Sequence, residues 1–166
     1  MLVITSTTTL VPDNPAAAYA AYRQAASAVF LAGTQGLKYK KDHYDLAVDL
    51  SKAGLTYIDE RADEIVIGAM TPLWQIKISQ AIQNFAGGAI SKAISDVADK
   101  NIQRYGTLGG VISSKAPFSV LLPILLSLHV DVQLQDKGCM SLDDYLHCPP
   151  MGELVTGISI AKEAVY

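Results

Sequence analysis

The feature that most constrains this chain is a glycine-rich stretch at residues 106–110, Gly-Thr-Leu-Gly-Gly, with apolar residues after it. Glycine has no Cβ, so it adopts positive φ easily and lets another group approach the backbone closely. We therefore predict a turn in which Gly106, Gly109 and Gly110 take positive φ and the backbone N–H groups cradle a phosphate. The Thr107 hydroxyl adds a donor. The alternative is a tight turn at a strand entry, with glycine serving backbone geometry alone.

A second Gly/Thr turn, earlier in the chain, favours the phosphate interpretation. An apolar run from Ala28 predicts a strand that leads into residues 32–37, Ala-Gly-Thr-Gln-Gly-Leu. A strand that ends in Gly-Thr-x-Gly presents several N–H groups and one hydroxyl at a single place, as a diphosphate requires. The Gly-x-Gly-x-x-Gly fingerprint followed by a helix is absent, so a Rossmann dinucleotide site is not predicted.

Composition and charge exclude several classes of protein. Half of the residues are hydrophobic and 17% are charged, which favours a subunit of an assembly over a free monomer, although an Ala- and Val/Ile/Leu-rich core is an alternative explanation. The net charge is −3 and the main basic run is Lys-Tyr-Lys-Lys at residues 38–41, so we expect no nucleic-acid partner. Residues 119–130 are too short to span a bilayer and are interrupted by Pro123.

The expected location is the cytoplasm. The N-terminus has no basic start followed by a long apolar run, so no secretory signal is predicted. Cys139 and Cys148 are expected to be free thiols in a reducing compartment. Two cysteines cannot hold an iron–sulfur cluster alone, since such clusters generally need four cysteine ligands.

Three helical regions have recognisable signals. Asn14-Pro15 predicts a helix capped by Asn14 that runs to about residue 26. Thr71-Pro72 predicts a second helix, with Thr71 as the cap, continuing towards Ile82, and Gly87-Gly88 separates it from a further helix. Residues 119–129 are expected to form a buried helix. Strands are predicted at residues 1–11, 28–31, 44–50, 56–58, 64–69, 130–134 and 153–160, with a strand end at residues 111–112 and a hairpin tip at residues 59–63.

The order of these features resembles the FAD-binding domain of molybdenum hydroxylase flavoprotein subunits, the family of xanthine dehydrogenase and carbon monoxide dehydrogenase medium subunits. The resemblance spans about residues 14–160. The family's first diphosphate turn reads approximately Ala-Gly-Gly-Thr-Asp-Leu, which residues 32–37 partly match. Its second turn reads Gly-Thr-Ile-Gly-Gly, which residues 106–110 match closely.

Two further motifs extend the resemblance. The family's Ile-Gly-Ala-Thr stretch corresponds to residues 67–69 together with Thr71. Pro117, Ser119 and Pro123 fall where the family has Pro-x-Ser-Asp-x-x-Pro, and Val120 occupies the place of the acidic residue. Gln103-Arg104 stands where the family usually has Arg-Asn.

The resemblance implies an α+β fold, a single two-lobed FAD-binding domain over residues 1–166 of the type shared with vanillyl-alcohol oxidase. Lobe 1 is expected at about residues 1–54 and lobe 2 at about residues 55–166, with FAD between them. Family subunits usually continue into a C-terminal domain, and this chain is expected to lack it because it ends at Tyr166. The cofactor-binding residues that the resemblance implies are Ala32, Gly33, Thr34, Gln35, Gly36, Leu37, Thr107, Gly109, Gly110 and Ser119.

The implied function is electron transfer in an oxidoreductase. Electrons from a molybdopterin-binding large subunit would pass through an iron–sulfur small subunit to FAD here and leave to NAD or another acceptor. We nominate no catalytic residue and no metal ligand, because His43, His129 and His147 are scattered and the chemistry belongs to the flavin. We also expect that Gly109→Val would abolish FAD retention while leaving the fold largely intact.

Two other functions stay open on the sequence alone. One is a docking module with the same fold that has lost its flavin, which Val120, the expected lack of a C-terminal domain and the apolar composition favour. A third alternative is another enzyme with the two-lobe FAD fold, such as an oxidase or a cell-wall reductase. The sequence shows no obvious His or Cys beside the first turn for covalent flavin attachment.

Overall fold

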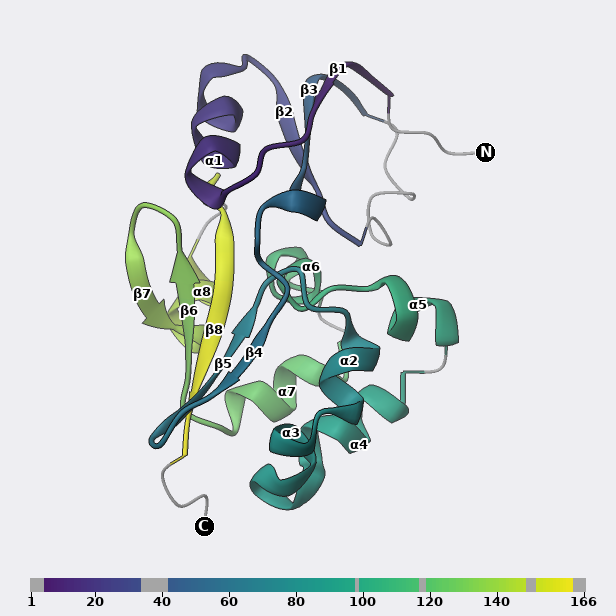
Figure 1. Cartoon of the computed structure of the whole chain (residues 1–166), viewed down its shortest axis with the longest axis vertical. Helices are drawn as coiled ribbons and strands as arrows, with labels where there is room; N and C mark the ends of the chain where they lie inside the picture. Colours follow the sequence, from purple (N-terminus) through teal and green to yellow (C-terminus); the bar gives the residue numbers. More distant parts are fainter. Residues whose placement is uncertain (1–4, 34–41, 98, 117–118, 149–151, 163–166) are drawn as a thin grey trace.

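The computed structural model describes residues 5–33, 42–97, 99–116, 119–148 and 152–162, and it contains two separate β-sheets (Figure 1). The first sheet has three parallel strands in the order β1-β3-β2, and the second has five antiparallel strands in the order β4-β5-β8-β6-β7. We use lobe 1 for the first sheet with its helix and lobe 2 for the second sheet with its helices. The predicted α+β class is confirmed, and the boundary near residue 54 stays a prediction.

Lobe 1 consists of β1 (Thr5–Leu10), α1 (Pro15–Gln24), β2 (Ala28–Leu31) and β3 (His43–Asp49). The predicted cap is confirmed, because the Asn14 side chain accepts a hydrogen bond from the N–H of Ala17 at 2.8 Å. On the inner side of α1 the Tyr22 ring stacks on Phe30 of β2, with 4.2 Å between the ring centroids. This packing attaches the helix to one face of the sheet and leaves the end of β2 pointing towards lobe 2 (Figure 1).

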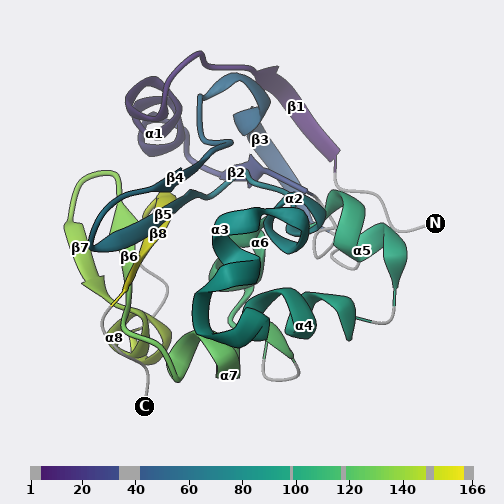
Figure 2. The same cartoon turned by 60° about the horizontal axis from the view of Figure 1, so that its bottom comes forward.

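Lobe 2 is organised around its antiparallel sheet. The strands are β4 (Ile58–Glu60), β5 (Glu64–Gly68), β6 (Val130–Leu134), β7 (Gly138–Ser141) and β8 (Val155–Ala161). The period-two pattern is visible in β6, where Val130, Val132 and Leu134 are buried and Asp131 is exposed. Helices cover the buried face of the sheet (Figure 2). The predicted β4–β5 hairpin is confirmed by the antiparallel pairing of Ile58 with Ile67.

The helices of lobe 2 are short. None of the helices in the described parts of the chain is long and apolar enough to cross a membrane. They are accompanied by two 3₁₀ turns, of which η2 lies at the connection between the lobes. The bounds are η2 (Leu50–Lys52), α2 (Leu73–Ile78), α3 (Gln80–Asn84), η3 (Phe85–Gly88), α4 (Ala89–Ser95), α5 (Lys100–Tyr105), α6 (Leu108–Ser114), α7 (Leu121–Leu126) and α8 (Leu142–His147).

Two predictions about α2 are wrong. Thr71 does not cap the helix, because Pro72 occupies the N-cap position and the Thr71 hydroxyl instead donates to the Tyr57 carbonyl at 2.9 Å. The helix also ends at Ile78, with Ser79 as its C-cap, and does not continue to Ile82. Ile82 comes six positions after Ile76, so one straight helix would put the two side chains on different faces. The break at Ser79 lets both isoleucines be fully buried in the core.

The predicted strand end at residues 111–112 is also wrong, because Val111 and Ile112 lie inside α6. The β-branched pair suggested a strand. The dominant signal is the N-cap at Thr107, whose side chain accepts from the N–H of Gly110 at 3.3 Å. Leu108 and Ile112 are then four residues apart on one helical face, and both are buried.

The buried tyrosines predict how stability depends on pH. Burial, and then a hydrogen bond to Glu153, raises the pKa of the Tyr19 hydroxyl, and burial raises the pKa of Tyr145. Above pH about 10 an unfolded tyrosine loses its proton before these two do, so the unfolded state is favoured and stability falls as pH rises. We expect Tyr145→Phe to reduce that fall in urea unfolding measured at pH about 7 and about 10.5. An equal fall in the variant and the wild type would contradict the assignment.

Candidate functional site

The structure brings the start of the first glycine turn into direct contact with the second turn. The backbone of Gly33, at the end of β2, lies against Tyr105 and Gly106, at the end of α5. A Cβ placed on Gly33 would be 2.0 Å from the Tyr105 carbonyl oxygen and 3.1 Å from the Gly106 Cα. No residue other than glycine fits this approach. The contact fixes the described start of the first turn directly on the second turn.

The second turn connects α5 to α6 and is held by the start of α2. The N–H of Leu73 donates to the Gly106 carbonyl at 3.0 Å, and the N–H of Leu108 donates to the Thr71 carbonyl at 3.1 Å. These two hydrogen bonds form an antiparallel bridge between Pro72 and Thr107. Thr107 is buried and caps α6. The turn is therefore a rigid part of lobe 2.

Gly109 packs against the end of β5. Its N–H donates to the Ala69 carbonyl at 2.8 Å, and a Cβ on Gly109 would be 2.8 Å from the Ala69 Cβ. The N–H of Ala69 in turn donates to the Thr156 carbonyl of β8 at 2.9 Å. The stretch from Ile67 to Thr71 thus supports the second turn, which explains why the two motifs occur together.

The predicted mechanism of the second turn needs correction. Gly106 has φ −66°, and neither Gly109 nor Gly110 is among the glycines with positive φ. The glycines are required for close packing, because Gly106 and Gly109 each face a neighbouring carbonyl with no room for a Cβ. Gly110 differs from them, because it is exposed and a Cβ there would meet only the Thr107 hydroxyl, at 3.1 Å. Gly110 is the glycine of this turn whose surface a ligand can reach.

The remaining predicted site residues are placed unevenly. Ala32 follows β2 and is half-buried. Thr34, Gln35, Gly36 and Leu37 lie outside the described residues. Ser119, half-buried before α7, accepts a hydrogen bond from the N–H of Leu122 at 3.4 Å. The neighbouring Val120 side chain is 44% exposed, and Pro117 lies outside the described residues.

Sequence reasoning missed two residues at the junction of the turns. Tyr105 is 54% exposed although its backbone contacts Gly33, and the Arg104 guanidinium lies 5.8 Å from the centre of the Tyr105 ring. Both belong to the last turn of α5. Their position immediately before Gly106 was the available signal, since residues next to a ligand-binding turn tend to reach the same ligand.

A third residue that sequence reasoning missed supports the other end of α6. Lys115 ends that helix in the left-handed conformation, with φ 47°. Its ammonium group donates to the carbonyl oxygens of Tyr145 at 2.6 Å and Cys148 at 2.5 Å, and it lies 4.8 Å from the centre of the Tyr145 ring. The positive charge stabilises the carboxyl end of α8 and attaches α8 to α6.

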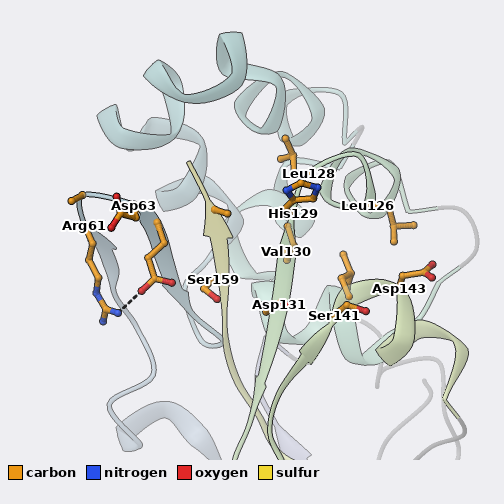
Figure 3. Close-up of a pocket in the computed structure, with 14 residues that line it drawn as sticks. Arg61, Asp63, Leu126, Leu128, His129, Val130, Asp131, Ser141, Asp143 and Ser159 are labelled. Carbon is orange, nitrogen blue, oxygen red and sulfur yellow. Dashed lines mark hydrogen bonds and ion pairs between the residues drawn. The ribbon is translucent and has the colours of Figure 1, made fainter. Parts of the chain in front are cut away.

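A cavity of about 900 Å³ opens at the far end of the lobe 2 sheet, lined by the β4–β5 turn, β6, β8 and the start of α8 (Figure 3). None of the predicted site residues lines it. Its lining contains four carboxylates, Asp63, Glu64, Asp131 and Asp143, and the Arg61 guanidinium already pairs with Glu64 at 2.6 Å. This charge repels a diphosphate. The cavity is therefore not the expected cofactor site.

The junction of the turns fits a diphosphate cofactor better. It offers the exposed backbone of Gly110, the hydroxyl of the buried Thr107 beside it, and an exposed arginine. Its tyrosine adds an aromatic surface. The described residues of the junction thus supply close approach, a donor and a positive charge, the three features by which proteins hold phosphate groups.

Comparisons with known proteins show the family of the chain. The family model described as the FAD binding domain in molybdopterin dehydrogenase matches residues 5–162. The uncharacterized protein YgfM of Escherichia coli (strain K12) is 30% identical over 124 residues, 74% of this chain and 46% of YgfM. The chain therefore spans about half the length of that curated relative.

Two solved structures are similar over most of this chain. The Cu,Mo-CO dehydrogenase in its cyanide-inactivated form matches with a TM-score of 0.86 at 25% identity, over 99% of this chain and 62% of that chain. The carbon monoxide dehydrogenase from Hydrogenophaga pseudoflava that lacks the Mo-pyranopterin moiety of its cofactor matches with a TM-score of 0.83 at 22% identity, over 94% of this chain and 59% of that chain.

The glycine contacts predict which substitutions destabilise the fold. Gly33→Ala and Gly109→Ala each insert a methyl group into a closed contact, so we expect each to lower the free energy of unfolding by roughly 1–3 kcal/mol. Gly110→Ala, at an exposed position of the same turn, is the control and should lower it by less than about 1 kcal/mol. Urea unfolding without cofactor measures all three. Equal stability of Gly109→Ala and Gly110→Ala would disprove the packing role, and the same contact argues against an undisturbed fold in Gly109→Val.

Proposed function

The chain belongs to the family of FAD-binding domains in molybdopterin dehydrogenases, and on that premise we propose that it is the electron-transfer subunit of a molybdenum-containing hydroxylase or dehydrogenase. FAD is the cofactor of this family. The observation that carries the proposal is the contact of Gly33, the described start of the first turn, with Tyr105 and Gly106 of the second.

The proposed binding residues are those of the two turns. Thr107, Gly109 and Gly110 support the diphosphate from lobe 2, with the Gly110 backbone and the Thr107 hydroxyl closest to it. Ser119, which precedes α7, is the further proposed binding residue of lobe 2. Lobe 1 would contribute the backbone of residues 32–37. When bound, FAD supplies one- and two-electron redox chemistry that no amino-acid side chain provides, and the protein holds the cofactor and excludes water from it.

The proposed partners follow from the electron path. A subunit with the molybdenum cofactor would oxidise the substrate, an iron–sulfur subunit would relay electrons to the FAD held here, and NAD or another acceptor would remove them. A xanthine dehydrogenase-like complex in the cytoplasm fits this path. Trp74 and Ile78, four residues apart on α2, are 39% and 58% exposed, which supports burial of this face in an assembly.

A docking module without flavin is the second candidate function. Val120 favours it, because an exposed apolar side chain stands where the family has an acidic residue. The two functions differ in one measurable property, the retention of FAD. A docking module would bind its partners equally well with and without the cofactor.

The test is the visible absorption spectrum of the purified chain after incubation with FAD and removal of free cofactor. Retained flavin bands at about one FAD per chain would support the proposal. A colourless protein that nevertheless co-purifies from its own host with molybdenum and iron, measured by elemental analysis, would favour the docking module. A colourless chain that gains FAD when those partners are present would assign the cofactor to the assembled complex.

Gly110 allows a charge-specific test of the diphosphate position. It is the third residue of α6, where an acidic side chain stabilises a helix. We expect Gly110→Asp to keep the stability of the chain but to weaken FAD binding roughly a hundredfold or more, because the carboxylate repels the diphosphate. Gly110→Asn has nearly the same shape without the charge and should weaken FAD binding much less. Equal dissociation constants for the two variants, measured by fluorescence titration, would place the diphosphate elsewhere.

A further inference from the structure

The second turn has few backbone donors left for a ligand. The N–H of Gly106 donates to the Ile102 carbonyl, and that of Leu108 to the Thr71 carbonyl. The N–H groups of Gly109 and Gly110 likewise donate to the Ala69 carbonyl and to the Thr107 hydroxyl. A diphosphate carries negative charge that must be matched when water is displaced. A cationic side chain near the turn is therefore needed to match it.

Arg104 is a cation at the right place. It lies in the last turn of α5, two residues before Gly106, and its side chain is exposed. Its contact in the described structure is with the neighbouring Tyr105 ring, and no carboxylate of the described residues pairs with it. Arg61, by contrast, pairs with Asp59 at 2.8 Å and with Glu64 at 2.6 Å. The Arg104 guanidinium is thus available to an anionic ligand.

The contact between the lobes fixes the backbone at the end of α5, next to Arg104. Because the Tyr105 carbonyl faces Gly33, the end of α5 lies directly against the end of β2, where the first turn begins (Figure 1). The Arg104 guanidinium lies 5.8 Å from the centre of the exposed Tyr105 ring, within the range of a cation–π interaction. Arg104 therefore lies next to the point where Gly33 contacts the backbone of Tyr105 and Gly106.

We propose that Arg104 binds the diphosphate of FAD and that Tyr105 is the positioning residue that holds its guanidinium. The inference rests on the proposed position of FAD between the two turns. A guanidinium presents a planar set of donors that matches two phosphate oxygens at once, which an ammonium group does not. The backbone of the turns then provides close approach, while the charge comes from α5.

The test compares Arg104→Gln with Arg61→Gln, which removes the same charge from a distant hairpin. Isothermal titration with FAD, ADP and riboflavin separates the parts of the ligand. We expect Arg104→Gln to weaken FAD and ADP binding roughly ten- to a hundredfold, to flatten the salt dependence of FAD binding, and to leave riboflavin binding unchanged. Arg61→Gln should change none of these affinities. Arg104→Lys should recover only part of the loss.

Tyr105 has its own matched pair of variants. Tyr105→Phe keeps the ring and should bind FAD as the wild type does, whereas Tyr105→Ala should weaken FAD binding without a matching loss of stability in the free chain. If the wild type binds FAD and both Arg104→Gln and Arg61→Gln bind it as tightly, the inference is wrong while the proposed function stands. If the wild type itself binds neither FAD nor ADP, alone or with its partners, both the proposed function and the inference about Arg104 are wrong.

Discussion

The structure depends on one steric constraint, the absence of a side chain at Gly33. The end of β2 can lie on the end of α5 only because nothing separates the Gly33 Cα from the Tyr105 carbonyl. The two lobes share little regular hydrogen bonding, since each has its own sheet. Apolar packing completes the seam, with Leu55 and Leu154 entering the core beneath α1. Close backbone approach at one point and side-chain packing at another thus determine how the lobes meet.

The same constraint organises the cofactor site. Gly109 packs on Ala69 with no room for a Cβ, so the second turn is supported from the end of β5 on one side and contacts Gly33 on the other. This rigidity limits ligand binding. The N–H groups of the turn already donate hydrogen bonds within the protein, so they are not free to donate to a phosphate. Side chains such as Thr107 and Arg104 become important for that reason. A site can be pre-organised in shape and still take its charge from a neighbouring helix.

Several elements were predictable because their signals are local. The Asn14 cap, the β4–β5 hairpin and the alternation of β6 each depend on a few adjacent residues, and the structure confirms them. The errors occurred where local signals compete. Thr71 has the composition of a cap, but its hydroxyl bonds to Tyr57 fourteen residues earlier. Val111 has a strand preference, but the cap at Thr107 and the buried face of α6 outweigh it.

The sequence by itself determined that this chain carries two Gly/Thr turns in the order of a two-lobed FAD-binding domain, because glycine and cap motifs are written in consecutive residues. Only the tertiary structure decided what those glycines do. A glycine needed for positive φ and a glycine needed for close approach look the same in the sequence. Only the position of a carbonyl from a distant segment tells the two roles apart. It also decided that Arg104 and Tyr105 lie at the junction, since a residue's distance from a ligand depends on contacts between segments far apart in the chain.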